Sequence, residues 1–393
     1  MAGFANTRHS ARYAQTMALA EATNRFVPFL DLHAIHDGLK ADLLEAMSAL
    51  IDAGDFTNGP AVAEFEQAFA EYCGTTLAIG LASGLDAVRL ALIAAGLEAG
   101  DEVIVPANTF VATLEAVTQA GGRPVVVDMS EEDWNLDVAL AEAAVTDRTR
   151  FVVPVHLYGQ LADMRALEAL AQRRGLQIVE DACQAHGAER DGVRAGASGR
   201  AAAFSFYPGK NLGAFGDAGA LTTSDEQLAV KIRALREHGQ TAKYVHDLEG
   251  YTARLDTIQA IVLLRKLAEL DAWNAQRTEI ASHYLRALCE VGDLELPPVA
   301  PGSEPVWHLF VVRTANPVAL GTFLRERGIG TGRHYPQPVH LTGAYRSLGY
   351  EPGTFPLAER HAERVLSLPI FPGMSIEQAD AVVTATRAFF ERA

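Results

Sequence analysis

The sequence has little cysteine: in 393 residues it contains only Cys73, Cys183 and Cys289, which lie far apart and form no CxxC pair. Cysteines in this arrangement favour neither a disulfide framework nor a zinc site, and they are typical of a reducing compartment. Carboxylates and histidines show no clustering at metal-ligand spacing either. We therefore expect a cytoplasmic protein that holds no metal.

Long hydrophobic runs and an excess of basic residues are also lacking. No run reaches about eighteen apolar residues, so we expect no membrane-spanning helix. The 33 Lys and Arg residues are outnumbered by 49 Asp and Glu residues, which gives a formal net charge of −16. Because nucleic acids and anionic membranes need a basic face, we expect neither as a partner. A phosphorylated small molecule is still compatible, since a helix N-terminus and a few hydroxyls bind it locally.

The sequence does contain a large apolar fraction, 49%, which is enough for a substantial core and usually means two domains at this length. From about residue 77, short apolar runs alternate with helical patterns. Strands are predicted at 77–83, 102–106, 123–129, 151–159, 176–182 and 201–207, and helices at 84–95 and 109–120. Strands that are apolar on both faces and separated by helices predict a mainly parallel α/β sheet covered on both sides.

The pattern changes after about residue 226. Helical periodicity covers 231–238 and 253–288, a proline-rich loop covers 294–305, and a strand is predicted at 306–313. This mixture indicates a smaller α+β domain at the C-terminal end.

We therefore predict three parts. They are an N-terminal extension at 1–25, a large α/β domain at 26–252, and a small C-terminal domain with a long linking helix at 253–393. The first twenty residues contain arginines and no acidic residues. We interpret them as a tail or an added surface helix rather than a transit peptide.

Ligands of open α/β sheets bind beyond the carboxyl ends of the strands, where three residues are candidates. Gly84 opens a predicted helix, whose free N–H groups attract phosphate, although glycine there is also typical of a plain turn. Phe110 can lie against a planar ring or belong to the core. Asp181 ends a strand, where a carboxylate either meets a cationic ligand or caps the following helix.

The segment FSFYPGKNLGAFGDAGA (204–220) is the most informative one. Ser205 ends an apolar strand, and Lys210 follows in a glycine-rich loop that lets a ligand approach closely. A lysine among apolar neighbours has a lowered pKa and is a competent nucleophile and Schiff-base former. A solvated surface lysine seldom lies between a strand and a Gly-x-x-Gly-x-x-Gly run. A nucleotide phosphate loop would need GxxxxGK[ST], which is absent.

Several segments together resemble the DegT/StrS family of pyridoxal-phosphate (PLP) aminotransferases, which make amino sugars and aminocyclitols from keto precursors. These segments are VPANTFVAT, IVEDACQAHGA, AFSFYPGKNLGAFGDAGA and ARLDTIQAIVLLRKL. The resemblance runs from about Val27 to the C-terminus. It implies a fold-type I architecture, PLP as cofactor with pyridoxamine phosphate formed during turnover, L-glutamate as donor, and a homodimer with shared active sites.

The resemblance also implies roles for individual residues. Lys210 is then the catalytic lysine that carries PLP as a Schiff base, and Asp181 is the partner of the pyridinium nitrogen. The other cofactor contacts are Gln184 near the phenolic oxygen, Phe110 on the ring, and Ser205, Gly84 and Leu85 at the phosphate.

The stretch after Gly250 is expected to reach the partner subunit's site. Many relatives have asparagine where this chain has Thr252. That departure leaves the phosphate contact from the partner open, although a threonine hydroxyl can donate.

Within the family, the likeness is to enzymes that act on nucleotide-linked, dTDP-type 3-keto-6-deoxy sugars. Tyr207 in FYPGKN, and His334 and Tyr335 in GRHYPQPVHL, match residues that surround the keto sugar in similar enzymes. Phenol and imidazole groups form hydrogen bonds with sugar hydroxyls and carbonyls. A purely structural role for His334 stays open.

Other functions fit parts of the pattern. A 4-keto nucleotide sugar or a keto-inositol is an alternative substrate that the sequence separates poorly. A sugar 3-dehydratase on the same fold has histidine at the lysine position, so Lys210 argues against it. A non-enzymatic regulator is disfavoured because no helix-turn-helix or basic stripe is present and a complete cofactor set would be surplus.

Overall fold

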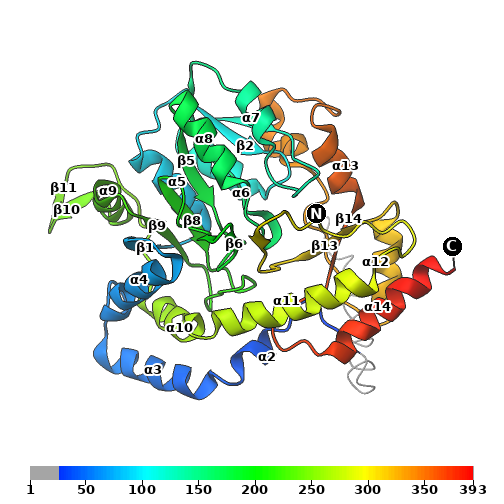
Figure 1. The fold of residues 1–393 in the computed structure, drawn as a ribbon. Coiled ribbons are helices and arrows are strands. Elements are labelled where there is room, and N and C mark those ends of the chain that lie inside the picture. The colour runs from blue at the N-terminus through cyan, green and yellow to red at the C-terminus, as the bar shows by residue number, and fades with distance from the viewer. Residues whose placement is uncertain (1–25, 393) are drawn as a thin grey trace, which may run out of the picture.

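A seven-stranded sheet forms the centre of the molecule (Figure 1). The computed structural model describes residues 26–392, so the extension predicted at 1–25 lies outside the described residues. The strand order is β1-β9-β8-β5-β4-β2-β3. The strands are β1 (Leu77–Leu81), β2 (Glu102–Pro106), β3 (Arg123–Val127), β4 (Thr149–Val152), β5 (Gln177–Asp181), β8 (Ala201–Ser205) and β9 (Gly219–Thr223).

The sheet is mainly parallel, as the sequence predicts. Only β9 runs antiparallel to its two neighbours, β1 and β8, among these seven strands. The strand predicted at 151–159 ends early, at Val152, because the chain passes Pro154 and then turns at Leu157–Gly159, where Tyr158 has a φ of 59°. β9 itself escaped prediction.

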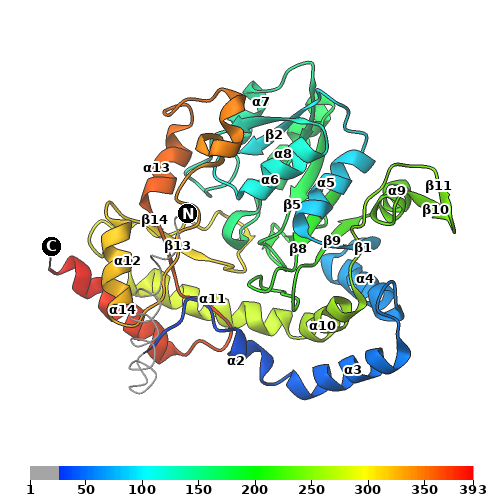
Figure 2. The same cartoon turned by 180° about the vertical axis from the view of Figure 1, so that it is seen from behind.

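Helices cover both faces of the sheet (Figures 1 and 2). On one face lie α5 (Gly84–Ala94), α6 (Val111–Gln119) and α9 (Glu226–Arg236), and on the other lie α7 (Val138–Ala143) and α8 (Met164–Arg174). Side chains alternate between the two layers along each strand: Val103 packs with the first group and Ile104 with the second. This two-residue period is what an apolar run in a doubly covered strand produces.

Two long helices lead from the sheet to the C-terminal elements. The helical pattern predicted at 253–288 divides into α10 (Thr257–Leu267) and α11 (Leu270–Ala287). α10 packs beside α4 (Pro60–Cys73), and α11 reaches α14 (Ile376–Phe390), as Figure 1 shows. α2 (Leu32–His36) and α3 (Lys40–Ala53) lie along the same side.

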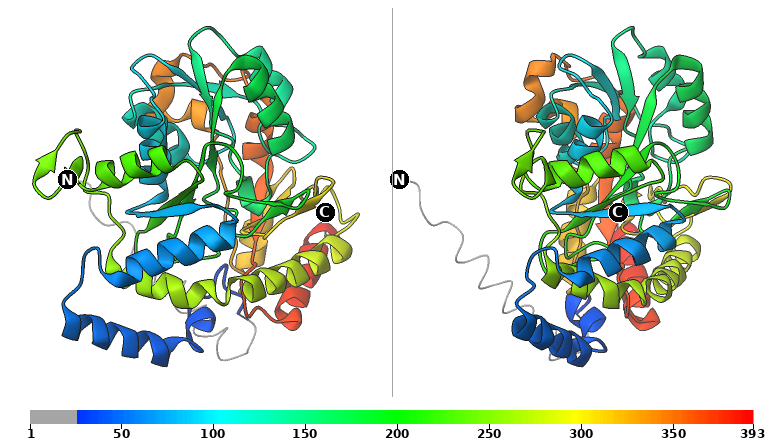
Figure 3. Two further views of the ribbon diagram at one scale, coloured as in Figure 1. Left: turned by 60° about the vertical axis from the view of Figure 1, so that its left-hand side comes forward. Right: turned by 90° about the vertical axis from the view of Figure 1, so that its left-hand side faces the viewer.

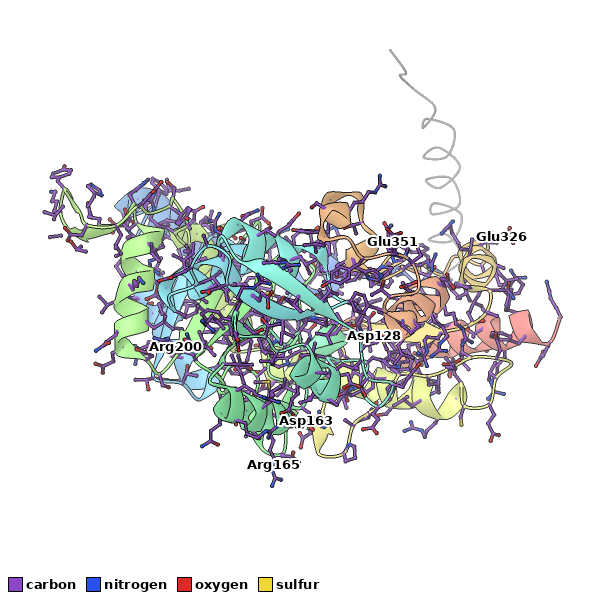
Figure 4. The ribbon with its side chains drawn as sticks, turned by 90° about the horizontal axis from the view of Figure 1, so that it is seen from above. Asp128, Asp163, Arg165, Arg200, Glu326 and Glu351 are labelled. Atoms are coloured by element: carbon purple, nitrogen blue, oxygen red, sulfur yellow. The ribbon has the colours of Figure 1, made fainter. Side chains whose placement is uncertain are left out.

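The C-terminal elements surround a further buried cluster. β13 (Phe310–Arg313) pairs antiparallel with β14 (Val365–Leu368), and α12 (Pro317–Arg325) packs on α14. α13 (Pro356–Arg364) is attached to the large sheet through Asp128, labelled in Figure 4, whose carboxylate accepts the amides of Leu357 and Ala358 at 2.9 and 2.8 Å. The domain boundaries proposed above stay a prediction.

A small hairpin stands away from the body of the molecule, as Figure 3 shows. It consists of β10 (Gln240–Ala242) and β11 (Val245–His246). Remaining short elements are β6 (Glu189–Arg190), β7 (Val193–Arg194), β12 (Ser303–Glu304) and the 3-10 turns Val339–Leu341 and Gly343–Leu348. Across residues 26–392, no helix has the length and apolar character needed to cross a membrane.

Candidate active site

Lys210 lies in the loop that follows β8, at the carboxyl edge of the parallel strands. Its backbone amide donates to the Tyr207 carbonyl at 2.8 Å, which closes a turn. Gly213 is required a few residues later, since a Cβ there would lie 2.4 Å from the Pro208 carbonyl oxygen. Burial lowers the pKa of the Lys210 amine, and the nearby Cys183 and Asp181 offset this shift only in part. The loop therefore presents an amine that loses its proton more easily than a surface lysine does.

Asp181 ends β5 beside this loop and is 7% exposed. One carboxylate oxygen accepts the Thr113 hydroxyl at 2.8 Å, and the other accepts the Cys183 amide at 3.3 Å. Both donors are neutral. Among the described residues no cationic side chain pairs with Asp181, so its carboxyl group is available to a cationic ligand atom.

The first turn of α5 and the end of β8 meet face to face. A Cβ built on Gly84 would lie 2.6 Å from both the Cys183 sulfur and the Ser205 Cβ. Ser83 caps the helix by accepting the Asp86 amide at 3.1 Å. The preceding amides, those of Gly84 and Leu85, have no acceptor within the helix because they belong to its first turn. Gly84, Leu85 and Ser205, predicted as a phosphate cradle, are thus brought together.

Gln184 links Lys210's surroundings to the predicted sugar end. Its side-chain carbonyl accepts the Tyr158 amide at 2.8 Å, and its amide nitrogen donates to the Tyr335 hydroxyl at 3.2 Å. The Tyr335 ring lies 5.2 Å from the ring of Phe110, centroid to centroid. Phe110 is 49% exposed, so it belongs to the open rim and not to the core.

His334 and Tyr207 occupy different environments. The His334 ring packs against Phe29, and its Nδ1 lies 2.7 Å from the Ser367 hydroxyl. Burial, together with the positive charge of Lys210, lowers the pKa of His334 to about 4, so the imidazole is neutral near pH 7. Tyr207 is 59% exposed and lies three residues before Lys210 in the same loop.

Thr252 stands apart from these residues. It is exposed, and its hydroxyl lies 3.2 Å from Nε2 of His238. Its neighbour Arg254 forms a bridge with Leu81 at the end of β1. No hydrogen bond within residues 26–392 joins the Thr252 side chain to Lys210, Asp181 or Gln184.

Two contributors escaped sequence reasoning. Thr113 holds the Asp181 carboxylate, and its only sequence signal is the four-residue spacing from Thr109, to which it is hydrogen-bonded at 2.8 Å. Tyr158 positions Gln184 through its amide, and its hydroxyl contacts the His334 carbonyl and lies 3.0 Å from Nε2 of His361. No local motif marks Tyr158, because its partners come from distant segments.

Other regions offer less. A cavity of about 400 Å³ lies between α4 and α9, but its Arg233 and Arg236 already pair with Glu66 at 3.6 and 2.5 Å. Within residues 26–392, no group of three or more His, Cys, Asp or Glu side chains is arranged to hold a metal ion. His340, one of the histidines without a predicted role, pairs with Glu359 at 3.1 Å.

The site formed by Lys210, Asp181 and the Gly84 turn suits the polar parts of PLP. The Lys210 amine would react with the aldehyde of PLP, the buried Asp181 carboxyl group would suit a protonated ring nitrogen, and the free amides of the Gly84 turn, packed against Ser205, would suit a phosphate. The class that this fold and site define is that of the fold-type I PLP-dependent enzymes.

A model of the DegT/DnrJ/EryC1/StrS aminotransferase family matches residues 38–387. The chain belongs to this family, which confirms the prediction made from its motifs.

Individual relatives are similar over almost the whole chain. A "dTDP-3-amino-3,4,6-trideoxy-alpha-D-glucose transaminase" from Streptomyces venezuelae is 49% identical over 93% of this chain and 97% of its own. The "Erythromycin biosynthesis sensory transduction protein EryC1" from Saccharopolyspora erythraea is 49% identical over 92% and 99%. A crystal structure of S. venezuelae DesV with a ketimine intermediate has a TM-score of 0.92 at 49% identity, covering 94% and 99%.

Proposed function

We propose that this chain is a PLP-dependent transaminase that moves an amino group from L-glutamate to the keto group of a dTDP-linked 3-keto-6-deoxy sugar. The observation that carries this proposal is Lys210, an amine of lowered pKa in a loop beside the buried Asp181 carboxylate. PLP, when bound, supplies the reactive carbonyl and the electron sink that amine transfer needs.

The chain's own residues divide the remaining work. Lys210 holds the cofactor and, once its amine is free, carries a proton to and from the reacting carbon through Nζ. Asp181 would pair with the ring nitrogen of bound PLP, because its donors within the chain, Thr113 and Cys183, are neutral and leave it without a cationic partner. Gly84, Leu85 and Ser205 hold the phosphate.

Gln184 acts through both ends of its side chain. Its carbonyl is fixed by the Tyr158 amide, so its amide nitrogen points to Tyr335, to which it donates. The Phe110 ring forms one wall of the cofactor site.

The sugar is expected to bind at the rim formed by Tyr207, His334 and Tyr335. Because His334 Nδ1 is bonded to Ser367, Nε2 is left for a sugar hydroxyl or carbonyl. The dTDP-3-amino sugar named for the S. venezuelae relative supports a 3-keto substrate. A 4-keto sugar or a keto-inositol is the alternative that substrate screening separates.

A second copy of the chain completes the site in this proposal. Thr252 and His238 form an exposed hydrogen-bonded pair, and His238 lies two residues before the projecting hairpin. The pair is available to a partner's cofactor phosphate, and a hydroxyl and an imidazole N–H can take the place of the asparagine found in many relatives.

A regulatory role is the second candidate, because one relative is named a sensory transduction protein. A regulator has no use for a lysine of lowered pKa beside a buried carboxylate. We therefore favour the enzyme.

The test combines visible absorbance with an assay of substrate turnover. Purified protein supplied with PLP should absorb in the visible range, and L-glutamate should bleach that band. Adding a dTDP-3-keto-6-deoxy sugar should then restore it, with 2-oxoglutarate formed in each cycle. A protein that stays colourless with PLP overturns the proposal, and bleaching without any reaction with the sugar overturns only the substrate.

A further inference from the structure

A second lysine lies beneath the Lys210 loop, and the mechanism above does not use it. Lys266, on α10, is only 2% exposed. Its Nζ donates to the Gly213 carbonyl oxygen and lies 3.1 Å from Nε2 of His36. A lysine is rarely buried unless its charge is paired, yet these partners are both neutral.

The rest of the Lys266 environment is aromatic. Its ammonium lies 5.9 Å from the ring centroid of Phe215 and 5.8 Å from that of Trp273. Ring faces attract a cation, which partly compensates for lost hydration. Burial lowers the pKa of Lys266 to about 8, so most molecules carry the charge at pH 7.

His36 is the side chain of α2 that faces this ammonium. Its ring hydrogen-bonds the Leu32 backbone, and burial and Lys266 together lower its pKa. Because the lowered pKa leaves the imidazole neutral, its Nε2 can accept a hydrogen bond from Lys266. The His36 ring also stands edge-on to Phe215 at 4.9 Å between centroids.

The atom that Lys266 holds belongs to the turn that shapes the catalytic loop. Gly213 packs directly against Pro208, which lies before Lys210 in the same loop. Two residues further on, the Phe215 amide donates to the Gln259 side chain at 2.8 Å, again from α10. α10 therefore holds the loop at two nearby points: Lys266 binds the Gly213 carbonyl, and Gln259 binds the Phe215 amide.

We propose that Lys266 is a positioning residue, whose ammonium fixes the Gly213 turn and thereby aims Lys210 at the cofactor. This inference rests on the proposed function, since it concerns how firmly the loop presents Lys210. His36 supports Lys266 by accepting its second hydrogen bond. Displacing a reacting group by about 1 Å costs on the order of 100-fold in rate, so a modest shift of the turn has a large effect.

The test uses Lys266→Met, which keeps the length and removes the donor. We expect kcat to fall about 10- to 100-fold with KM for the sugar little changed. The dissociation constant for PLP, measured by visible absorbance without substrate, should rise about ten-fold. Lys231→Met is the matched control, because Lys231 also donates to a backbone carbonyl, Ala94 at 3.1 Å, away from the loop.

A pH series provides the second readout. As pH rises through about 8, Lys266 loses its proton and the bond to Gly213 loses its charge assistance. Release of PLP from the wild type should therefore speed up across this range, and Lys266→Met should lose this dependence. The facing groups are His36, whose lowered pKa keeps it neutral here, and the uncharged Phe215 and Trp273.

The outcomes separate the two proposals. If wild type fails to bind PLP, the proposed function falls. If wild type binds PLP but Lys266→Met matches Lys231→Met in kcat and PLP affinity, Lys266 is only structural and the inference is overturned. Should Lys266→Met fail to fold, His36→Leu decides: weaker PLP binding supports the inference, and unchanged binding together with a flat wild-type pH series overturns it.

Discussion

The two ends of the site are built differently. At the cofactor end, Asp181 and Gln184 are 7% and 4% exposed and hydrogen-bonded within the chain. At the rim, Tyr207 is 59% exposed, and Phe110, whose ring is proposed to border both the cofactor and the rim, is 49% exposed. The cofactor end is held by hydrogen bonds within the chain, whereas the rim presents exposed side chains.

This difference separates chemistry from specificity. The buried end has preorganised hydrogen bonds, which is the condition for a defined reaction type. The rim has exposed rings and a neutral imidazole, which under the proposed function would contact the sugar and select the ketone. Changes at the buried end should therefore reduce turnover of every substrate, while changes at the rim should alter substrate preference or assembly.

The largest effect is expected for Lys210→Ala. Removing the amine takes away both the covalent anchor and the proton carrier, so kcat should fall by at least about 10³-fold. Transaminase assays with 2-oxoglutarate detection measure this, and visible absorbance should show no covalently held PLP. Wild-type turnover by Lys210→Ala would show that the buried end is not the reacting centre.

Asp181→Asn should rank next. The amide has nearly the same shape but no charge, so the ring nitrogen loses its anionic partner, and kcat should fall by about two orders of magnitude. Thr113→Val is the matched control, since it removes one hydrogen bond from Asp181 and keeps the carboxylate. Equal losses in both variants would mean that geometry matters there and charge does not.

The same contrast explains what the sequence could reveal. The sheet and the Lys210, Asp181, Gly84 and Ser205 cluster follow from local signals, namely apolar strands that end in polar or glycine residues. The hydrogen bonds of Thr113, Tyr158 and Lys266 join segments far apart in the chain, so no sequence spacing predicts them. β9 was missed because its sequence, GALTT, lacks the run of large apolar residues that marks most of the other strands.

Gly84→Ala tests the phosphate cradle with an intermediate effect. A Cβ there meets the Cys183 sulfur and the Ser205 Cβ at 2.6 Å, so the turn must shift. The dissociation constant for PLP should rise about 10- to 100-fold. The double variant with Cys183→Ala should recover part of the affinity because one of the two clashes disappears. If the PLP affinity does not recover, the clash with the Ser205 Cβ alone accounts for the loss.

Acid stability offers a smaller effect at the buried end. Burial lowers the pKa of His186 to about 3, whereas an unfolded histidine titrates near 6.5, so the folded state binds fewer protons between these values. The free energy of unfolding is therefore highest above about pH 6.5, and it decreases as the pH falls below that value. His186→Phe should remove about 2 kcal/mol of the difference in unfolding free energy between pH 7 and pH 5.

Denaturant titration at the two pH values measures that difference. The exposed His33 provides the control, and His33→Phe should leave the pH dependence as in the wild type. An unchanged acid response in His186→Phe would mean that the buried imidazoles do not govern stability there.

The smallest effect on the single chain is expected at the projecting hairpin. Tyr244 is 82% exposed, so Tyr244→Ser should change the free energy of unfolding by no more than about 0.5 kcal/mol. If a second copy covers this edge, the same change should raise the dimer dissociation constant about ten-fold, because buried tyrosines are frequent interface hot spots. Sedimentation over a concentration series measures this, with Val318→Ser, 65% exposed on α12, as the control. Equal dissociation constants for both variants would show that the hairpin is not part of a dimer interface.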